Sequence, residues 1–164
     1  MSSPIDAPAH LRQVFAVAAA ARADGDHPFG ALLVVDGVVV AEARNRVHTN
    51  HDITAHAELM LVRNLERDGA LHLLGDGTVF ASCEPCPMCV GAMFWAGARS
   101  IVYGLSAQRL NGLASPTDSS PFGFAITAGQ LAVQATPAMH VDGPNLEDEA
   151  VAAHRGYWNP ASVS

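Results

Sequence analysis

Residues 78–104 read TVFASCEPCPMCVGAMFWAGARSIVYG, and this stretch decides the fold. Its first part, Thr78 to Ser82, is mostly apolar or β-branched and predicts a short buried strand. Pro87 to Ala96 predicts a helix, because proline suits the first helical position and Gly97 follows the last. Ser100 to Gly104 predicts a second strand. A strand, a helix and a strand in this order indicate a parallel crossover.

The chain before this stretch adds two helices and a hairpin. Residues 9–23 place apolar side chains at helical spacing and predict an amphipathic helix. The β-rich runs ALLVV and VVVAEA flank Asp36-Gly37, which is the strongest short-range signal for a hairpin. Ala55 to Arg67 predicts a second helix, with Thr54 as a possible N-cap. This alternation predicts the α/β class, as a three-layer α/β/α sandwich with a mixed central sheet.

The chain after residue 104 gives weaker signals. Leu105 to Thr127 is rich in Ser, Pro and Gly and predicts a long functional loop. Leu131 to Ala135 predicts a strand. Pro144 to His154 predicts a closing helix, capped near Asn145 and followed by an aromatic tail at residues 157–158.

Composition limits the possible functions. The chain has 164 residues, 49% of them hydrophobic, which suits one domain over residues 1–164. It carries a formal charge of -7 and has no lysine, which excludes lysine Schiff-base chemistry and a glycine-lysine P-loop. The acidic charge also argues against binding to nucleic acid or to an anionic membrane, because like charges repel. We see no targeting or membrane-spanning segment and expect a cytoplasmic protein.

Three residues have the spacing of metal ligands. Cys86 and Cys89 are separated by two residues, so one chain turn presents both sulfurs to one tetrahedral ion. His56 adds an imidazole, about 30 residues earlier. Three protein ligands leave a fourth position for water, which is typical of a catalytic zinc site. We therefore predict Zn²⁺ as the cofactor.

Glu58 gives this metal site its chemistry. A carboxylate beside a zinc-activated water can carry protons to a ring nitrogen and to a departing amine. His56-Ala57-Glu58 followed by Pro85-Cys86-Pro87-Met88-Cys89 is the signature of zinc nucleobase deaminases. His56 and Glu58 share a site only if both lie at the start of a helix, because residues i and i+2 diverge inside one.

Other interpretations of these residues are weaker. A purely structural metal site has no use for Glu58 and wants a fourth ligand. Cys83 extends the pattern to three cysteines, but an all-cysteine iron–sulfur site needs a fourth. We interpret Cys83 as a small buried residue at the end of a strand. Arg44 and Arg46 are most simply a solvated face, although they are the first candidates for phosphate contacts with an RNA.

The motifs resemble those of the cytidine deaminase-like superfamily from about Pro28 to Gly104, and bacterial guanine deaminases most of all. Bacterial tRNA adenosine deaminases share the outline, with Val in place of Phe29 and usually of Pro87. The stretches that carry the resemblance are Pro28-Phe29-Gly30-Ala31, Asn45, Ala55-His56-Ala57-Glu58, Ser82 to Cys89, Gly91-Ala92 and Trp95-Ala96.

The resemblance implies a role for each matched residue. His56, Cys86 and Cys89 bind zinc, and Glu58 shuttles protons. Phe29 and Asn45 contact the base, and backbone amides around Ala57 hold a carbonyl oxygen of the substrate. The resemblance also makes Trp95 a candidate pocket residue. Guanine deaminases carry a second acidic shuttle after the strand that ends near Gly104, for which the nearest candidate is Asp118. Their C-terminal aromatic residue closes over the site, and Tyr157 or Trp158 is the candidate here.

The sequence thus predicts a zinc-dependent hydrolytic deaminase acting on a free purine base, with guanine-like bases as the leading candidates, or on a related small amino-heterocycle. A tRNA adenosine deaminase and a cytosine or nucleoside deaminase stay open as alternatives. A noncatalytic zinc-stabilised interaction domain is the alternative outside enzymes. A homodimer is expected, because small deaminases of this kind usually assemble and the aromatic tail offers an apolar patch.

Overall fold

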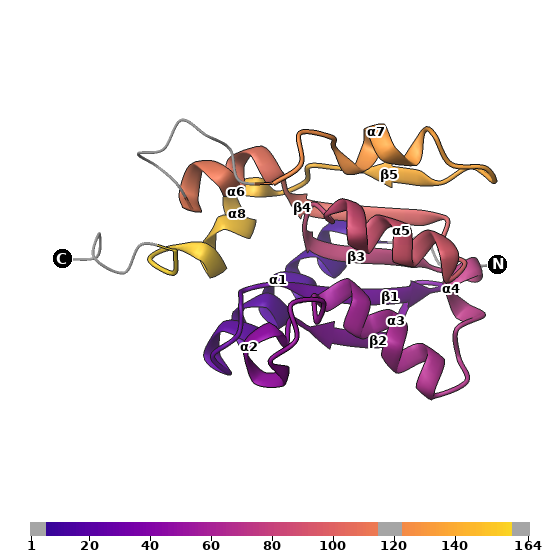
Figure 1. The fold of residues 1–164 in the computed structure, drawn as a ribbon, viewed down its shortest axis with the longest axis horizontal. Helices are drawn as coiled ribbons and strands as arrows, with labels where there is room; N and C mark the ends of the chain where they lie inside the picture. Colours follow the sequence, from indigo (N-terminus) through magenta and orange to yellow (C-terminus); the bar gives the residue numbers. More distant parts are fainter. Residues whose placement is uncertain (1–5, 115–122, 159–164) are drawn as a thin grey trace.

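The computed structural model describes residues 6–114 and 123–158, and it has a central mixed sheet. The sheet consists of β1 (Gly30–Val35), β2 (Val38–Arg44), β3 (Thr78–Cys83), β4 (Ser100–Leu105) and β5 (His140–Asp142). Its strand order is β2-β1-β3-β4-β5, with β2 and β5 at the two edges (Figure 1). β1 pairs antiparallel with β2 and β3, whereas β3, β4 and β5 run parallel. The predicted fold class is confirmed.

The hairpin forms where the sequence predicted it. Asp36 and Gly37 have φ angles of 49° and 78°, and Val35 pairs with Val38 across the turn. Two consecutive positive φ angles define the turn whose twist matches that of paired strands, and the Asp-Gly pair tolerates them. The turn therefore fixes the register of β1 against β2.

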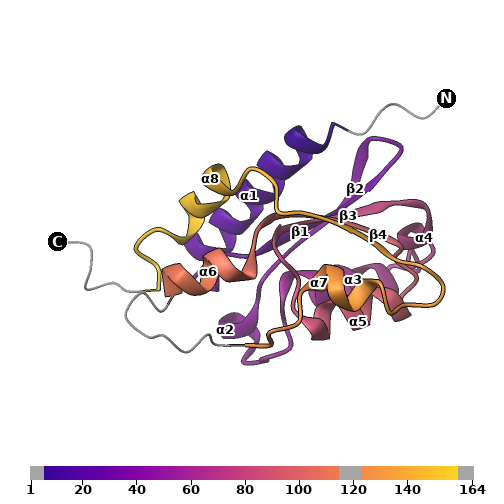
Figure 2. The same cartoon turned by 90° about the horizontal axis from the view of Figure 1, so that it is seen from above.

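Helices cover both faces of the sheet. Figure 2 shows α1 (Ala7–Ala23) and α8 (Glu147–Ala150) on one side, and α3 (Ala57–Arg67), α5 (Pro87–Trp95) and α7 (Ala128–Ala132) on the other. Every residue of β3 is buried between these layers. This explains why its sequence is continuously apolar or small and does not alternate. The remaining short elements are α2 (Val47–Asn50), α4 (Leu73–Asp76), α6 (Ala107–Ala114) and a 3-10 helix over Val151–His154.

The core has one part on each side of the sheet. Leu11 and Val14 of α1 pack with Leu32 and Phe80 on the first side. On the second side, Leu61 of α3 and the helices beside it pack against the other face of the strands. All five side chains are at most 1% exposed. The predicted helical stripe of residues 9–23 is thus confirmed as the inner face of α1.

Several predictions after residue 104 are wrong. The expected loop over 105–127 contains α6, and the expected strand over 131–135 is part of α7 and its end. A capping box starts α7, because Thr127 and Gln130 exchange side-chain and backbone hydrogen bonds. The last strand of the sheet lies further on, at β5.

Two predicted caps are also wrong. The last helix begins at Glu147, and its N-cap is Leu146; the Asn145 backbone N–H donates instead to Gly104 of β4. Thr54 does not cap α3, since its hydroxyl donates to Asp52 at 2.6 Å. His56 occupies that N-cap position.

Candidate active site and metal centre

The site lies where β3 and β4 end and two helices begin. His56 is the N-cap of α3 and Cys86 is the N-cap of α5, both with extended backbone. Pro87 starts α5 with its fixed φ, and Cys89 follows in the first turn. The sharp transition from strand to helix therefore presents both sulfurs on one side of the chain. Ligand sites at the carboxyl ends of parallel strands are the rule in open α/β sheets.

His56, Cys86 and Cys89 form a compact donor set. His56 Nδ1 lies 3.7 Å from Cys86 Sγ and 3.6 Å from Cys89 Sγ, and the two sulfurs are 3.6 Å apart. Bonds of about 2.3 Å to sulfur and about 2.0 Å to nitrogen in a tetrahedron require separations of roughly 3.5 to 3.8 Å. The observed triangle fits a tetrahedral zinc ion. No fourth His, Cys, Asp or Glu joins this group within the described residues.

The electrostatics of the three ligands favour a cation. The hydrogen bond between the two sulfurs lowers the pKa of Cys86 to about 4. The same bond, followed by burial, raises the pKa of Cys89. The contact with Cys86 raises the pKa of His56. The lowered pKa of Cys86 favours its thiolate form near neutral pH, and a thiolate is a donor suited to a dication.

Glu58 lies beside the metal ligands in the first turn of α3. Only 7% of its surface is exposed, and it lines the same cavity as His56 and Cys86. Burial raises the pKa of Glu58. Because His56 still has the extended backbone of an N-cap, residues i and i+2 face one site here, as the sequence analysis required. A buried carboxyl with a raised pKa suits proton transfer near neutral pH.

A cavity of about 430 Å³ opens in front of these residues. A cavity of this size accommodates a small heterocycle. Its walls are mainly apolar, and the lining residues within the described chain include no arginine. The lining residues are His27, Phe29, His56, Glu58, Cys83, Glu84, Pro85, Cys86, Pro87, Ala107, Leu110, Asn111, Ala114, Gly123, Phe124, Ile126 and Trp158.

The other predicted site residues have different positions. Phe29 lines the cavity, whereas Ala57 is buried at the first position of α3. Asn45 is only 1% exposed and does not line the cavity; its side-chain oxygen accepts from the Val47 backbone at 3.1 Å. Trp95 is 83% exposed on α5 and lies outside the cavity lining, so the structure does not place it in the pocket. Asp118 lies outside the described residues.

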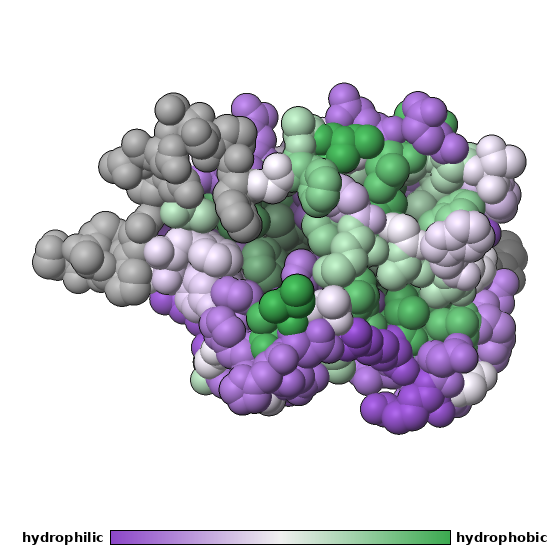
Figure 3. All heavy atoms as spheres, viewed as in Figure 1, coloured by the Kyte–Doolittle hydropathy of each residue, from purple (hydrophilic) through white to green (hydrophobic). Residues whose placement is uncertain are grey.

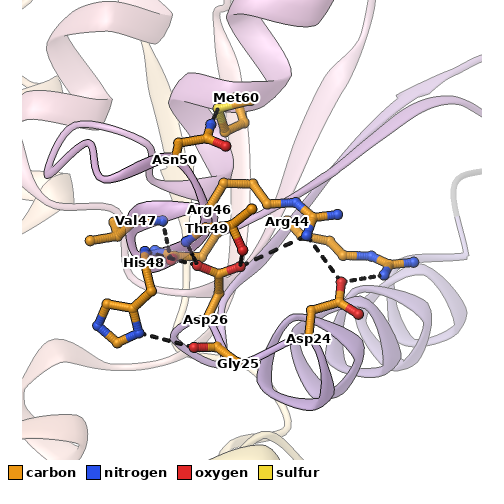
Figure 4. A network of polar contacts seen from close by, with 11 residues as sticks. Asp24, Gly25, Asp26, Arg44, Arg46, Val47, His48, Thr49, Asn50 and Met60 are labelled. Atoms are coloured by element: carbon orange, nitrogen blue, oxygen red, sulfur yellow. Dashed lines mark hydrogen bonds and ion pairs between the residues drawn. The ribbon is translucent and has the colours of Figure 1, made fainter.

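A polar network holds the segment that carries Asn45. The fully buried carboxylate of Asp26 accepts from the backbone N–H groups of His48 and Thr49 and from the Thr49 hydroxyl (Figure 4). Arg46 lies between Asp26 and Asp24, at 3.8 and 3.2 Å. The network satisfies the buried charge and fixes α2 against the end of α1. Arg46 is therefore engaged within the protein, and so is Arg44, which donates to Asp24.

The aromatic tail reaches the cavity. Trp158 lines it, stacks on His27 with ring centroids 5.5 Å apart, and donates from Nε1 to His154 Nδ1 at 3.2 Å. Tyr157 Oη lies 2.9 Å from His27 Nδ1. The sequence analysis gives no role to His27 or His154. His154 is next to the tail in the sequence, whereas only the fold brings His27 to it.

Residues 6–105 match the sequence model of the family described as cytidine and deoxycytidylate deaminase zinc-binding region. The chain belongs to this deaminase family. It is a hydrolytic deaminase with a zinc site, and the matched segment includes His56, Glu58, Cys86 and Cys89. The recognition made from the motifs is confirmed at this level.

Relatives of this deaminase differ in the substrates that their names give. The chain is 37% identical over 155 residues to a probable cytosine deaminase of Schizosaccharomyces pombe, covering 92% of this chain and 91% of that protein. It is 40% identical over 97 residues to guanine deaminase of Bacillus subtilis, covering 59% of this chain and 56% of that one. The exact substrate therefore does not follow from these similarities.

Solved structures agree on the fold. The guanine deaminase of Nitrosomonas europaea superposes with a TM-score of 0.74 at 23% identity, covering 96% of this chain and 85% of that one. A tRNA:A34 deaminase superposes with a TM-score of 0.67 at 29% identity, covering 88% of this chain and 99% of that one. The α/β sandwich of this deaminase is thus the fold of its family.

Proposed function

We propose that this deaminase acts on a free base, with guanine as the leading candidate. The observation that carries the proposal is the cavity. It joins the metal ligands and Glu58 to largely apolar walls, and its size suits one small heterocycle. Phe29 and Trp158 supply aromatic walls for a planar ring. Asn45 and the backbone amide of Ala57 remain predicted contacts for the substrate.

Nucleotides fit this cavity poorly. The charge of a phosphate group in a protein site is normally matched by arginine or lysine. The chain has no lysine, and no arginine lines the cavity within the described residues. Arg44 and Arg46, the first candidates for RNA contacts, are bound to Asp24. These features favour an uncharged small substrate over a nucleotide or a folded RNA.

The reaction requires proton transfer at two points. Zinc, when bound, supplies the activation of water that hydrolytic deamination needs. Glu58 takes a proton from the attacking water and delivers it to the ring nitrogen beside the reacting carbon. Glu58 then takes the remaining proton of the added hydroxyl and gives it to the amine, so that the C–N bond breaks, the C–O bond becomes a carbonyl and the amine leaves as ammonia. The buried position of Glu58 shields these transfers from bulk water. Asp118 remains the predicted second shuttle.

Cytosine is the second candidate, because the probable cytosine deaminase of S. pombe aligns over 92% of this chain. Ammonia release from purified protein separates the candidates. The panel contains guanine, cytosine, adenine, their nucleosides, dCMP and an anticodon stem-loop RNA. We expect ammonia from guanine or cytosine. Inosine in the RNA, with no ammonia from any free base, would refute the proposal.

We also propose a homodimer, formed through the outer face of α5. This helix contains no charged residue, and Met88 and Trp95 on it are 39% and 83% exposed. Val133, at the end of the neighbouring α7, is 77% exposed. Figure 3 shows apolar surface spread over this side of the molecule. A helix that is apolar all round is normally buried.

A second copy suits this face because the small residues Gly91 and Ala92 lie between Met88 and Trp95 on α5 and allow two helices to approach closely. Light scattering of the wild type should give twice the chain mass, and Trp95→Glu should shift it towards the monomer. A wild type that is monomeric at working concentration would contradict the dimer.

A further inference from the structure

One face of α6 forms a wall of the cavity. Four of its residues, at positions i, i+3, i+4 and i+7, line the cavity: Ala107, Leu110, Asn111 and Ala114. Three of them are apolar. Asn111 is thus the single polar side chain that this face offers to a ligand.

The carboxamide of Asn111 forms no hydrogen bond with any other described residue. Such a group needs a partner when a ligand displaces water from an apolar cavity. It presents an acceptor and a donor side by side, so it pairs best with a ligand edge that has a donor next to an acceptor. The substrate is therefore the natural hydrogen-bond partner for the Asn111 carboxamide.

Two carboxylates fix the start of α6. Glu84 Oε2 accepts from the Ala107 backbone at 3.0 Å, and its other oxygen accepts from Ala128 at the start of α7. Glu147 Oε1 accepts from the Ser106 backbone and hydroxyl at 2.9 and 2.6 Å. Negative charge at a helix N-terminus is also stabilising. Asn111 therefore stands on an anchored helix, so little ordering is needed when it binds a ligand.

We propose that Asn111 determines specificity by pairing with the lactam edge of the substrate, an N–H beside a C=O. Guanine and cytosine both carry this edge, and in both it is separate from the unprotonated ring nitrogen that receives a proton from Glu58. The carboxamide oxygen accepts from the lactam N–H, and the amide NH₂ donates to the carbonyl. The inference rests on the proposed function, since it requires a free base in the cavity.

Two pairs of bases test this pairing, because each pair keeps the reacting amine and differs in the lactam. 2-Aminopurine is guanine without its lactam, and 4-aminopyrimidine is cytosine without its lactam. Asn111→Leu should lower kcat/KM for the lactam base by about 10- to 100-fold, the range of a lost bidentate contact. It should change kcat/KM for the matching lactam-free base less than threefold. The loss should appear mainly in KM, because the contact exists before and during the reaction.

Gln108→Leu is the matched control, since Gln108 is an exposed carboxamide on the same helix. It should leave both rates at the wild-type level. Circular dichroism and zinc content establish that both variants are folded. Equal losses on a lactam base and its lactam-free partner, or no loss on either, would overturn the role of Asn111. A wild type without activity on any free base would instead refute the proposed function.

Discussion

Acid should destabilise this protein through His154, which lies beneath the aromatic tail. Its imidazole is 2% exposed, and its Nδ1 accepts the hydrogen bond from Trp158. Burial, followed by the charge of Arg22, lowers the pKa of His154 to about 4. Folded His154 is therefore neutral down to about pH 4, whereas the unfolded chain takes up this proton below about pH 6.5.

The magnitude follows from the distance between these two values. The unfolded state binds more protons between about pH 6.5 and pH 4, so the free energy of unfolding falls as the pH drops through this window. At about 1.36 kcal/mol for each pH unit, the contribution lost is at most about 3.4 kcal/mol. Between pH 7.0 and pH 4.5 we expect about 1 to 2 kcal/mol, because this range covers only part of the window and the folded protein relaxes around a charged imidazole. Above pH 6.5 the contribution is fully present.

Urea unfolding at pH 7.0 and pH 4.5 measures this loss. His154→Gln removes the titrating group, so its unfolding free energy should depend on pH less than that of the wild type. Any acid-induced loss of metal cancels in the comparison, since both proteins keep the same ligands. His140→Gln, at an exposed position of β5, serves as the control. An equal pH dependence in wild type and His154→Gln would refute the reasoning.

Three further changes probe the site. Glu58→Gln keeps the shape of the side chain but removes its basic carboxylate. Turnover should fall at least about 10²-fold, while elemental analysis still finds zinc. Loss of zinc together with activity would instead make Glu58 a structural residue. The wild type should hold about one zinc per chain. Replacing Cys86 and Cys89 together by Ala should abolish zinc binding and lower Tm, because bound metal stabilises the folded state. Unchanged metal content would contradict the assignment of the ligands. Asp118→Ala should lower guanine turnover with zinc content unchanged, and full activity would exclude Asp118 as the second shuttle.

The sequence predicted the first two thirds of the fold because its signals there are local. The Asp36-Gly37 turn and the proline at the start of α5 each act on their immediate neighbours. The metal ligands were found for the same reason, since two of them are three residues apart. Thr127 and Gln130 form a capping box, which is a local signal for the start of a helix. The prediction of a strand over residues 131–135 did not take this signal into account.

The rest of the site depends on contacts between distant segments. α6 is anchored by Glu84 and Glu147, which lie 23 residues before Ala107 and 41 residues after Ser106. A reading of residues 105–127 alone contains neither anchor. The stacking of Trp158 on His27 likewise joins segments that are distant in the sequence. Trp95 shows that a local motif can also mislead. Its motif is shared with guanine deaminases, but the motif does not reveal which side of α5 faces solvent.

The wall formed by α6 separates recognition from chemistry within one cavity. The metal ligands and Glu58 stand on α3 and α5, while Ala107, Leu110, Asn111 and Ala114 stand on a helix that holds none of them. We expect exchanges of those four side chains to leave the metal ligands and Glu58 in place, because the first turn of α6 is fixed by Glu84 and Glu147. With this division, a few substitutions in α6 should be enough to change the substrate specificity of the enzyme. A small library at these positions, selected on different heterocycles, would exploit it directly.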